Sequence, residues 1–160
     1  MSIDGRISLD STRLPDWTST EDWKYFQKSL KKMDAVVAGR ATYDVAKAHM
    51  DKRNSYVLTR SVTEAKKEGS VTFVNPAHTD VAALLSKYKN VGNVGGAEAY
   101  QTMLDLGLFD DLYLTIEPIV FGRGQALFTG GAKNHSFTLV SAKKLNKKGT
   151  LLLHYKITHA

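Results

Sequence analysis

The chain has 160 residues, of which 42% are hydrophobic and 24% are charged, and its formal net charge is +6. This length and composition fit one globular domain that spans residues 1–160. The absence of cysteine excludes disulfides, thiolate metal sites and cysteine nucleophiles. No apolar run approaches the roughly 20 residues of a membrane helix, and the N-terminus lacks the apolar stretch of a secretion signal, so we expect a cytoplasmic protein.

The positive charge is compatible with two kinds of partner, nucleic acid and small anionic ligands such as nucleotide cofactors. The lysine pairs are scattered at the ends of predicted elements, and no strand interleaves aromatic with basic residues as base stacking requires. We therefore expect a small-molecule substrate, with no nucleic acid and no membrane as partner, in a monomer or homodimer. The five histidines lack metal-ligand spacing, so no metal site is predicted.

The first predicted element is an amphipathic helix that begins near residue 18. Thr18 and Glu21 form the T-x-x-E pattern of a capping box. The face that we expect to be buried carries apolar residues at helical spacing: Trp23, Phe26, Leu30 and Met33. Asp22 lies on the border of this face, one turn before Phe26. The acid either stabilises the helix N-terminus, as first-turn acids often do, or belongs to a functional site.

Strands and helices alternate along the rest of the chain. The sequence predicts strands at 34–38, 55–59, 71–74, 91–94 and 112–116. It predicts helices at 42–50, from Thr79 onwards, and at 97–106, where Gly107 ends the helix. Two further strands, 137–143 and 150–158, form a hairpin around 146–149. Alternation implies right-handed crossovers, so we predict an α/β three-layer sandwich with a mostly parallel central sheet and an antiparallel C-terminal hairpin.

Three predicted strand ends carry residues that suit a phosphate group. They are Gly39, Arg40 and Thr42; Leu58, Thr59 and Arg60; and Gly95 and Gly96. Glycine lets the backbone approach a ligand, helix-start amides bind anions, and guanidinium and hydroxyl groups donate to phosphate oxygens. Tight packing without a ligand explains most double glycines, and a solvated arginine with a helix cap explains the Gly39 junction equally well, but three such junctions are harder to dismiss than one. The dinucleotide fingerprint, the P-loop and the G-x-S-x-G elbow are all missing, so those binding modes and hydrolase chemistry lack support.

Seven short segments, taken in order, carry a resemblance to a known family. They are S-I-D-G-R-I at 2–7, L-P-D-W at 14–17, E-D-W-K-Y-F at 21–26, G-R-A-T-Y at 39–43, L-T-R at 58–60, V-G-G-A-E-A-Y at 94–100 and L-Y-L-T at 112–115. Over nearly its whole length the chain resembles the dihydrofolate reductase superfamily, which includes the reductase domain of riboflavin biosynthesis.

The resemblance implies a role for four residues of the substrate pocket. It implies that Asp22 binds the amino and N3 edge of a pterin and that Phe26 packs on the ring. Trp17 would line the same pocket, and Thr115 would donate a hydrogen bond to the acid. Asp22 and Trp17 are thus the expected catalytic residues.

The resemblance also implies NADPH as the cofactor. The residues that it assigns to the pyrophosphate and its surroundings are Gly39, Arg40, Thr42, Gly95, Gly96, Ala97 and Glu98. The segment Leu58, Thr59 and Arg60 would approach the adenosine 2′-phosphate, which favours NADPH over NADH.

The expected reaction is the reduction of 7,8-dihydrofolate to tetrahydrofolate by hydride transfer from NADPH. One alternative is the riboflavin-pathway reductase, which acts on 5-amino-6-(5-phosphoribosylamino)uracil, and P-I-V-F-G-R-G at 118–124 resembles those enzymes. Their D-D-P-x-L segment is replaced here by residues 44–47, D-V-A-K, which favours a pterin. A second alternative is a non-catalytic nucleotide-binding protein.

Members of the family have a complete strand before the segment at 2–5, and Met1 falls where that strand ends. The backbone of that strand contributes to the pterin pocket in the family. We expect the chain to begin at an internal methionine rather than to manage without this strand.

Overall fold

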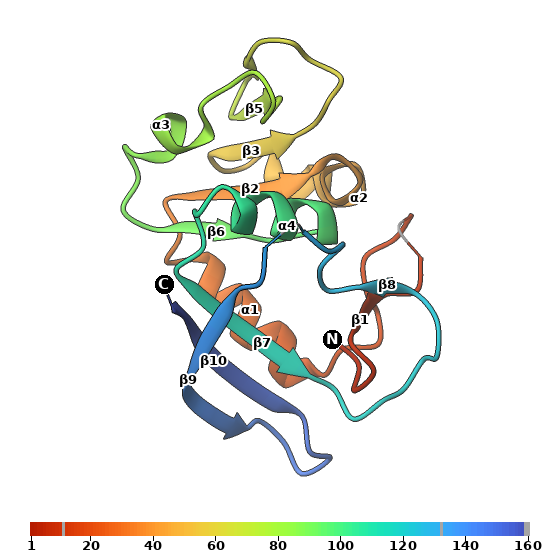
Figure 1. Cartoon of the computed structure of the whole chain (residues 1–160). Coiled ribbons are helices and arrows are strands. Elements are labelled where there is room, and N and C mark those ends of the chain that lie inside the picture. The colour runs from red at the N-terminus through yellow and green to blue at the C-terminus, as the bar shows by residue number, and fades with distance from the viewer. Residues whose placement is uncertain (11, 132, 159–160) are drawn as a thin grey trace.

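The computed structural model describes residues 1–10, 12–131 and 133–158 (Figure 1). The elements in chain order are β1(Arg6–Ser8), α1(Thr20–Leu30), β2(Ala35–Gly39), α2(Arg40–Met50), β3(Ser55–Leu58), β4(Lys66–Glu68), β5(Val71–Val74), α3(Val81–Leu85), β6(Val91–Asn93), α4(Ala97–Asp105), β7(Asp111–Ile116), β8(Gln125–Ala126), β9(Ser136–Lys144) and β10(Leu151–Thr158). They form a five-stranded sheet in the order β4-β5-β3-β2-β6, a three-stranded sheet β7-β10-β9, and the pair β1-β8.

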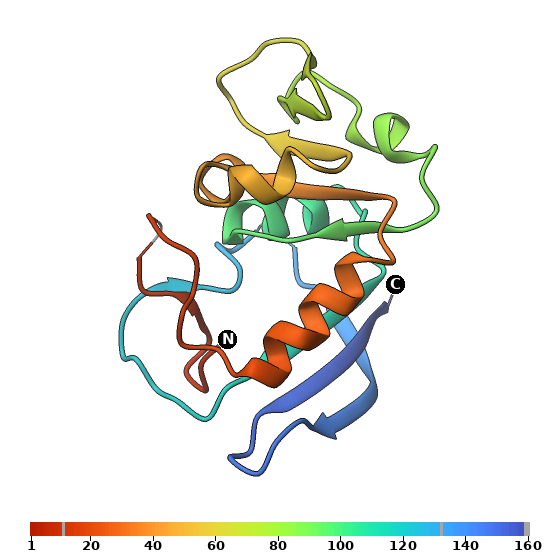
Figure 2. The same ribbon diagram turned by 180° about the vertical axis from the view of Figure 1, so that it is seen from behind.

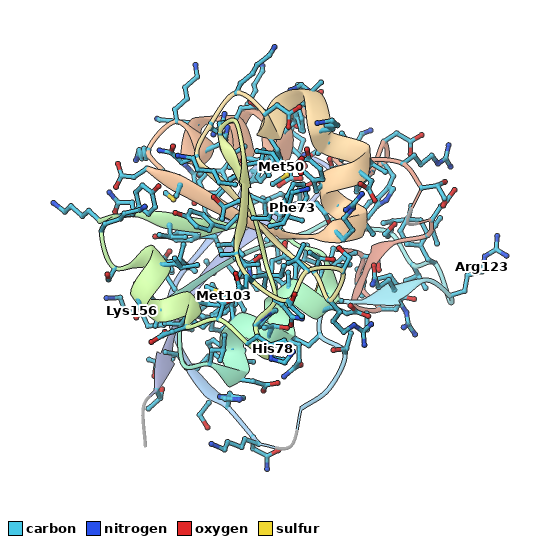
Figure 3. All side chains as sticks on the ribbon, turned by 90° about the horizontal axis from the view of Figure 1, so that it is seen from above. Met50, Phe73, His78, Met103, Arg123 and Lys156 are labelled. Atoms are coloured by element: carbon cyan, nitrogen blue, oxygen red, sulfur yellow. The ribbon has the colours of Figure 1, made fainter. Side chains whose placement is uncertain are left out.

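The five-stranded sheet contains the main core. Its strands β2, β3, β5 and β6 are parallel, and only β4 runs antiparallel. Alternate residues of β2 point to opposite faces: Val37 packs with α3 and α4, whereas Val36 packs with α2. Figure 3 shows Met50 and Phe73 on the α2 side and Met103 on the α4 side. Because both faces are covered by helices, the strands read as continuous apolar runs, and the predicted three-layer α/β arrangement is confirmed.

The C-terminal hairpin is also confirmed. β10 pairs antiparallel with β9 on one side and with β7 on the other. The hairpin nevertheless does not form the edge of the parallel sheet. Within the described ranges β6 pairs only with β2, and β7 only with β10, so the two larger sheets remain separate.

The N-terminal segment reaches β7 at the end of that strand. Glu117 donates its N–H to the Met1 carbonyl at 2.8 Å, and Ser2 forms an isolated parallel bridge with Glu117. Residues 1 and 2 therefore lie beside the last part of β7, while the rest of the β7 edge borders a cleft.

Helix α1 differs from the sequence prediction at its start and on its apolar face. The helix begins at Thr20, and its N-cap is Ser19, whose hydroxyl accepts the Asp22 N–H at 3.3 Å. The predicted Thr18 capping box is therefore wrong by one residue. The predicted buried face is also wrong, because no residue of α1 is buried and Trp23 is 48% exposed. The physical reason is that Trp23 and Phe26 border a cleft, while Leu30 and Met33 pack against the edge of the core and are only partly buried. Figure 2 shows α1 in front of β7.

The other boundaries agree with the predictions to within two residues, except that α3 is a single short turn of helix. Gly107 ends α4 with a positive φ of 70°, and the Leu108 N–H donates to the Met103 carbonyl in a Schellman motif. The sequence missed β1, β4 and β8, which have three residues at most and therefore show no periodicity. In the described part of the chain, no helix has the length and hydropathy of a membrane span.

Candidate active site

A cleft of about 1680 Å³ extends from the carboxyl ends of the parallel strands to the edges of β6 and β7. Ligands of open parallel sheets bind at this end, where strands lead into helices. Every residue proposed from the sequence lines it: Trp17, Asp22, Phe26, Gly39, Arg40, Thr42, Leu58, Thr59, Arg60, Gly95, Gly96, Ala97, Glu98 and Thr115. The volume exceeds the roughly 300 to 1,000 Å³ of common small-molecule pockets, so it has room for a substrate beside a cofactor.

Helices α2 and α4 follow parallel strands whose ends border the cleft, and both have glycine N-caps. Neither Gly39 before α2 nor Gly96 before α4 provides a side-chain cap. Helices α1 and α3, by contrast, are capped by the side chains of Ser19 and Asp80. First-turn amides without a side-chain cap, at the positive end of a helix, form a site for an anion. The Gly39 N–H donates to the Gly95 carbonyl at 2.7 Å, which places the two helix starts side by side.

The double glycine allows close packing around these helix starts. Gly95 has a φ of +100°, and a Cβ there would lie 3.0 Å from the Tyr100 hydroxyl. A Cβ on Gly96 would lie 3.4 Å from the Thr42 hydroxyl. The peptide bond between the two glycines is cis. A side chain at either position would therefore disturb the space between α2 and α4.

The basic residues of the cleft have different surroundings. The Nε of Arg40 donates to both carboxylate oxygens of Asp44, at 2.9 and 3.1 Å, and its guanidinium lies 5.6 Å from the Phe73 ring centroid. Arg60 is exposed just beyond β3, and no ion pair of Arg60 occurs among the residues that the structure describes. Arg40 would share its positive charge between Asp44 and a ligand. Arg60 would offer its whole charge to a ligand.

The acid and the aromatic ring share one wall of the cleft, as expected from the sequence. Asp22 is half-buried in the first turn of α1, and Phe26 follows one turn later with 37% exposure. The Trp23 ring lies 5.9 Å from the Phe26 ring between centroids. Before the helix, Trp17 packs edge-on against Phe121 at 4.9 Å. This wall thus offers a carboxylate and exposed aromatic surface to the same space.

Thr115 lies on β7 and also lines the cleft. Its carbonyl accepts a hydrogen bond from the Met1 nitrogen. The hydrogen bond from the Thr115 hydroxyl to Asp22 that the resemblance implies does not occur in the described parts of the chain. The role of Thr115 therefore stays a prediction.

The cleft is also lined by polar residues that the sequence did not single out, among them Tyr100, Gln125 and Asn75. Burial raises the pKa of Tyr100 to about 12, so its hydroxyl stays protonated beside Gly95. The Gln125 side-chain oxygen lies 3.8 Å from where a Gly96 Cβ would be. Asn75 is buried and donates to the Val62 carbonyl at 2.8 Å. Only Tyr100 had a usable signal, since it follows Gly96 by one helical turn.

Comparison with known proteins identifies the family. The dihydrofolate reductase family model matches residues 7–159. One relative, the uncharacterized protein YwjB of Bacillus subtilis (strain 168), is 29% identical over 172 residues, which cover 97% of this chain and 92% of YwjB.

Two solved structures show the same fold. A pyrimidine reductase-like protein from Corynebacterium diphtheriae NCTC is 17% identical, with a TM-score of 0.76. The match covers 100% of this chain and 90% of the C. diphtheriae chain. Dihydrofolate reductase from Enterococcus faecalis, complexed with NADP(H) and RAB-propyl, is 21% identical, with a TM-score of 0.66. This match covers 99% of this chain and 92% of the E. faecalis chain. Since the family model spans nearly all of its residues, the chain belongs to the dihydrofolate reductase family.

Proposed function

We propose that this protein is an NADPH-dependent reductase that converts 7,8-dihydrofolate to tetrahydrofolate. One observation carries the proposal: the two helix N-termini without side-chain caps and the Asp22 carboxylate open into the same cleft. The first feature suits the diphosphate of a dinucleotide, and the second suits the amino-bearing edge of a flat heterocycle. Membership of the family supports the assignment to reductases.

The residues at the helix starts fit a dinucleotide. A Cβ at Gly39 would lie 3.8 Å from the Gly96 nitrogen, so glycine keeps the approach to both helix starts open. The first-turn amides of α2 and α4 would bind the diphosphate, with the Thr42 hydroxyl beside them. Thr59 and Arg60 would hold a 2′-phosphate at the end of β3. When bound, NADPH supplies the hydride for the reduction.

Asp22 would orient and charge-stabilise the substrate. Its two carboxylate oxygens can accept hydrogen bonds from the 2-amino group and from N3 of a pterin, which fixes the ring in one orientation. The negative charge also favours a pterin that has gained a proton at N5. Phe26 offers apolar surface to the face of the ring, and Trp17 would close the same pocket.

The second candidate is the reduction of 5-amino-6-(5-phosphoribosylamino)uracil. It is supported by the higher TM-score of the pyrimidine reductase-like neighbour, 0.76 against 0.66 for the E. faecalis enzyme. The loop after β7 adds support, because its Phe121 packs on Trp17, which lines the cleft, and belongs to the segment that resembles riboflavin-pathway enzymes. Both candidates use the same cofactor cradle and differ in the substrate.

The deciding experiment measures NADPH oxidation with dihydrofolate, with the aminopyrimidine phosphate and without substrate. Turnover of dihydrofolate alone supports the main proposal, and turnover of the pyrimidine alone supports the second candidate. NADPH binding by calorimetry without turnover of either substrate would contradict both. In that case the protein is a non-catalytic nucleotide-binding member of the family.

The variant Asp22→Asn tests the role of the acid. We expect kcat/KM for dihydrofolate to fall on the order of 10²-fold or more, because a preorganised charge is lost, while the Kd for NADPH changes little. Glu21→Gln is the matched control, since it removes one negative charge from the same first helical turn. Equal losses in both variants would mean that Asp22 acts only as a helix-start charge.

A further inference from the structure

Glu117 is a buried carboxylate at the end of β7, with only 5% of its surface exposed. One of its oxygens accepts the backbone N–H of Ser19 at 2.7 Å. The other accepts the hydroxyl of Thr150, also at 2.7 Å, and Thr150 is fully buried. A buried carboxylate is costly unless hydrogen bonds satisfy it, and here both oxygens have a donor. Glu117 therefore connects three elements that are far apart in the sequence.

The Ser19 end of this connection leads directly to Asp22. Ser19 is the N-cap of α1, and its hydroxyl accepts the Asp22 backbone N–H. Its carbonyl accepts the first helical hydrogen bond, from the Trp23 N–H at 3.0 Å. The residue that Glu117 holds thus determines where α1 begins. Two successive hydrogen bonds separate the Glu117 carboxylate from the backbone of the candidate acid.

The Thr150 end is held by the turn of the β9–β10 hairpin. The Asn146 side chain donates to the Thr150 hydroxyl oxygen at 2.9 Å, and its own oxygen accepts the Thr150 N–H at 3.2 Å. With its oxygen accepting from Asn146, the Thr150 hydroxyl directs its hydrogen towards Glu117. The hairpin thus gives Glu117 a fixed partner.

The apolar contacts of α1 lie beyond its first turn, since Leu30 packs against the core beside β2 and α2 and the Tyr25 ring lies 6.2 Å from the Tyr113 ring between centroids. None of its residues is buried, and its aromatic side chains face the cleft. Helix α4, which also borders the site, has five buried residues that fix its position. Two charge-assisted hydrogen bonds therefore restrain the start of α1: the short one from the Ser19 N–H to Glu117, and a longer, exposed one of 3.2 Å from the Asn146 side chain to Glu21.

We propose that Glu117 is a positioning residue, which ties the N-cap of α1 to the β9–β10 hairpin and thereby sets the position of the Asp22 carboxylate in the cleft. This inference rests on the proposed role of Asp22 in substrate binding. It does not require Glu117 to touch the substrate or the cofactor.

The charge state of Glu117 agrees with this role. Burial by itself would raise the pKa of Glu117, but the hydrogen bonds from Ser19 and Thr150 outweigh burial and leave the pKa below its usual value. The residue is therefore ionised at neutral pH and accepts both hydrogen bonds in its charged form.

The kinetic test compares Glu117→Met with Glu117→Gln. Methionine keeps the length but leaves the Ser19 N–H without an acceptor, whereas the glutamine oxygen can still accept it. We expect Glu117→Met to lower kcat/KM for dihydrofolate by on the order of 10- to 100-fold with the Kd for NADPH within about twofold, and Glu117→Gln to recover most of the loss. Thr138→Val is the control, because it removes a hydrogen bond of the same hairpin that does not reach α1.

A second readout does not depend on turnover. Backbone amide exchange, measured by NMR on the protein without ligand, should quicken at Ser19 and Asp22 in Glu117→Met while the start of α2 keeps its rate. Thr150→Val offers a milder variant should Glu117→Met not fold, and a smaller change of the same kind is expected. Unchanged exchange at Ser19 and Asp22, or an equal weakening of NADPH binding, would overturn the positioning role. If the wild-type protein reduces neither substrate, the proposed function is overturned. The amide-exchange rates at Ser19 and Asp22 then decide by themselves whether Glu117 anchors the start of α1.

Discussion

The two larger sheets of the molecule differ in how far their strands are buried. All four residues of β3 and four of the five in β2 are buried, whereas β9 and β10 contain no buried residue. The helices that border the cleft follow the same division. Helix α4, which begins at the candidate cofactor cradle, has five buried residues, and α1, which carries the candidate acid, has none.

This difference has a physical origin and a consequence for the site. Parallel strands need crossover helices, which cover both faces of their sheet, while an antiparallel sheet can leave one face to solvent. The glycine helix starts therefore rest on a rigid base. The acid lies in the first turn of a helix with no buried residue, where hydrogen bonds hold the N-cap, and we expect local opening to be easier there.

The largest expected effect tests the difference in burial with two valines. Val37→Ala removes two methyl groups from the middle of β2, where the side chain is fully buried, and should lower the free energy of unfolding by about 2 to 3 kcal/mol. Val140→Ala, on β9 with 52% exposure, should change it by less than about 0.5 kcal/mol. Urea unfolding of both variants measures the two values. Equal losses would refute the division between a packed and an open half.

The next effect concerns the cofactor half. Arg60→Ala should weaken NADPH binding by about 1.5 to 3 kcal/mol, the value of a hydrogen bond to a charged group, and leave NADH binding nearly unchanged. Calorimetric titration with both dinucleotides measures the difference. Lys89→Ala is a control, since it removes another positive charge that lines the cleft, away from the β3 end. An unaltered preference for NADPH would remove Arg60 from the cofactor site.

A smaller effect tests whether the two sheets unfold together. Gly149, in the β9–β10 turn, has a φ of +103°, and Gly107, after α4, has a φ of +70°, with no atom in the way of a Cβ at either position. Alanine at either should cost about 1 to 2 kcal/mol through backbone strain. In a cooperative molecule both variants shift one common thermal transition. If Gly149→Ala shifts a separate early transition, the three-stranded sheet unfolds on its own.

The smallest effect concerns the N-terminal turn beside the cleft. The Ser2 hydroxyl and the N–H groups of Phe121 and Gly122 hold the pKa of Asp4 at about 2, below the ordinary value of 3.8. Because the folded pKa is the lower one, this contribution to stability is fully present above pH 3.8 and is lost as the pH falls to about 2. Thermal unfolding over this range should show a shallower pH dependence in Asp4→Asn than in the wild type. Identical slopes would show that Asp4 does not tie the turn to the loop at Phe121.

The outcome of the sequence predictions follows from the range over which each signal acts. Apolar runs located the buried strands to within about one residue, and Gly107 correctly ended α4. The buried face of α1 was wrong because amphipathic spacing identifies an apolar stripe but not what covers it. Trp23 and Phe26 belong to such a stripe and nevertheless line a cleft.

The candidate site shows the same limit. The glycine junctions at Gly39 and Gly96 could be found because strand, glycine and helix are consecutive in the chain. Gln125 lies on a two-residue strand with no pattern of its own, and Glu117 gave no signal because its partners are 98 and 33 residues away.

The sequence by itself determined the order of the longer strands and helices, the parallel core and the glycine-marked helix starts, since all of these depend on local periodicity and backbone freedom. Only the tertiary structure decided that α1 would border an open cleft, that the hairpin would form a separate sheet with β7, and that Glu117 would join Ser19 to Thr150. Those features depend on which distant surfaces meet, and packing of the whole chain fixes that.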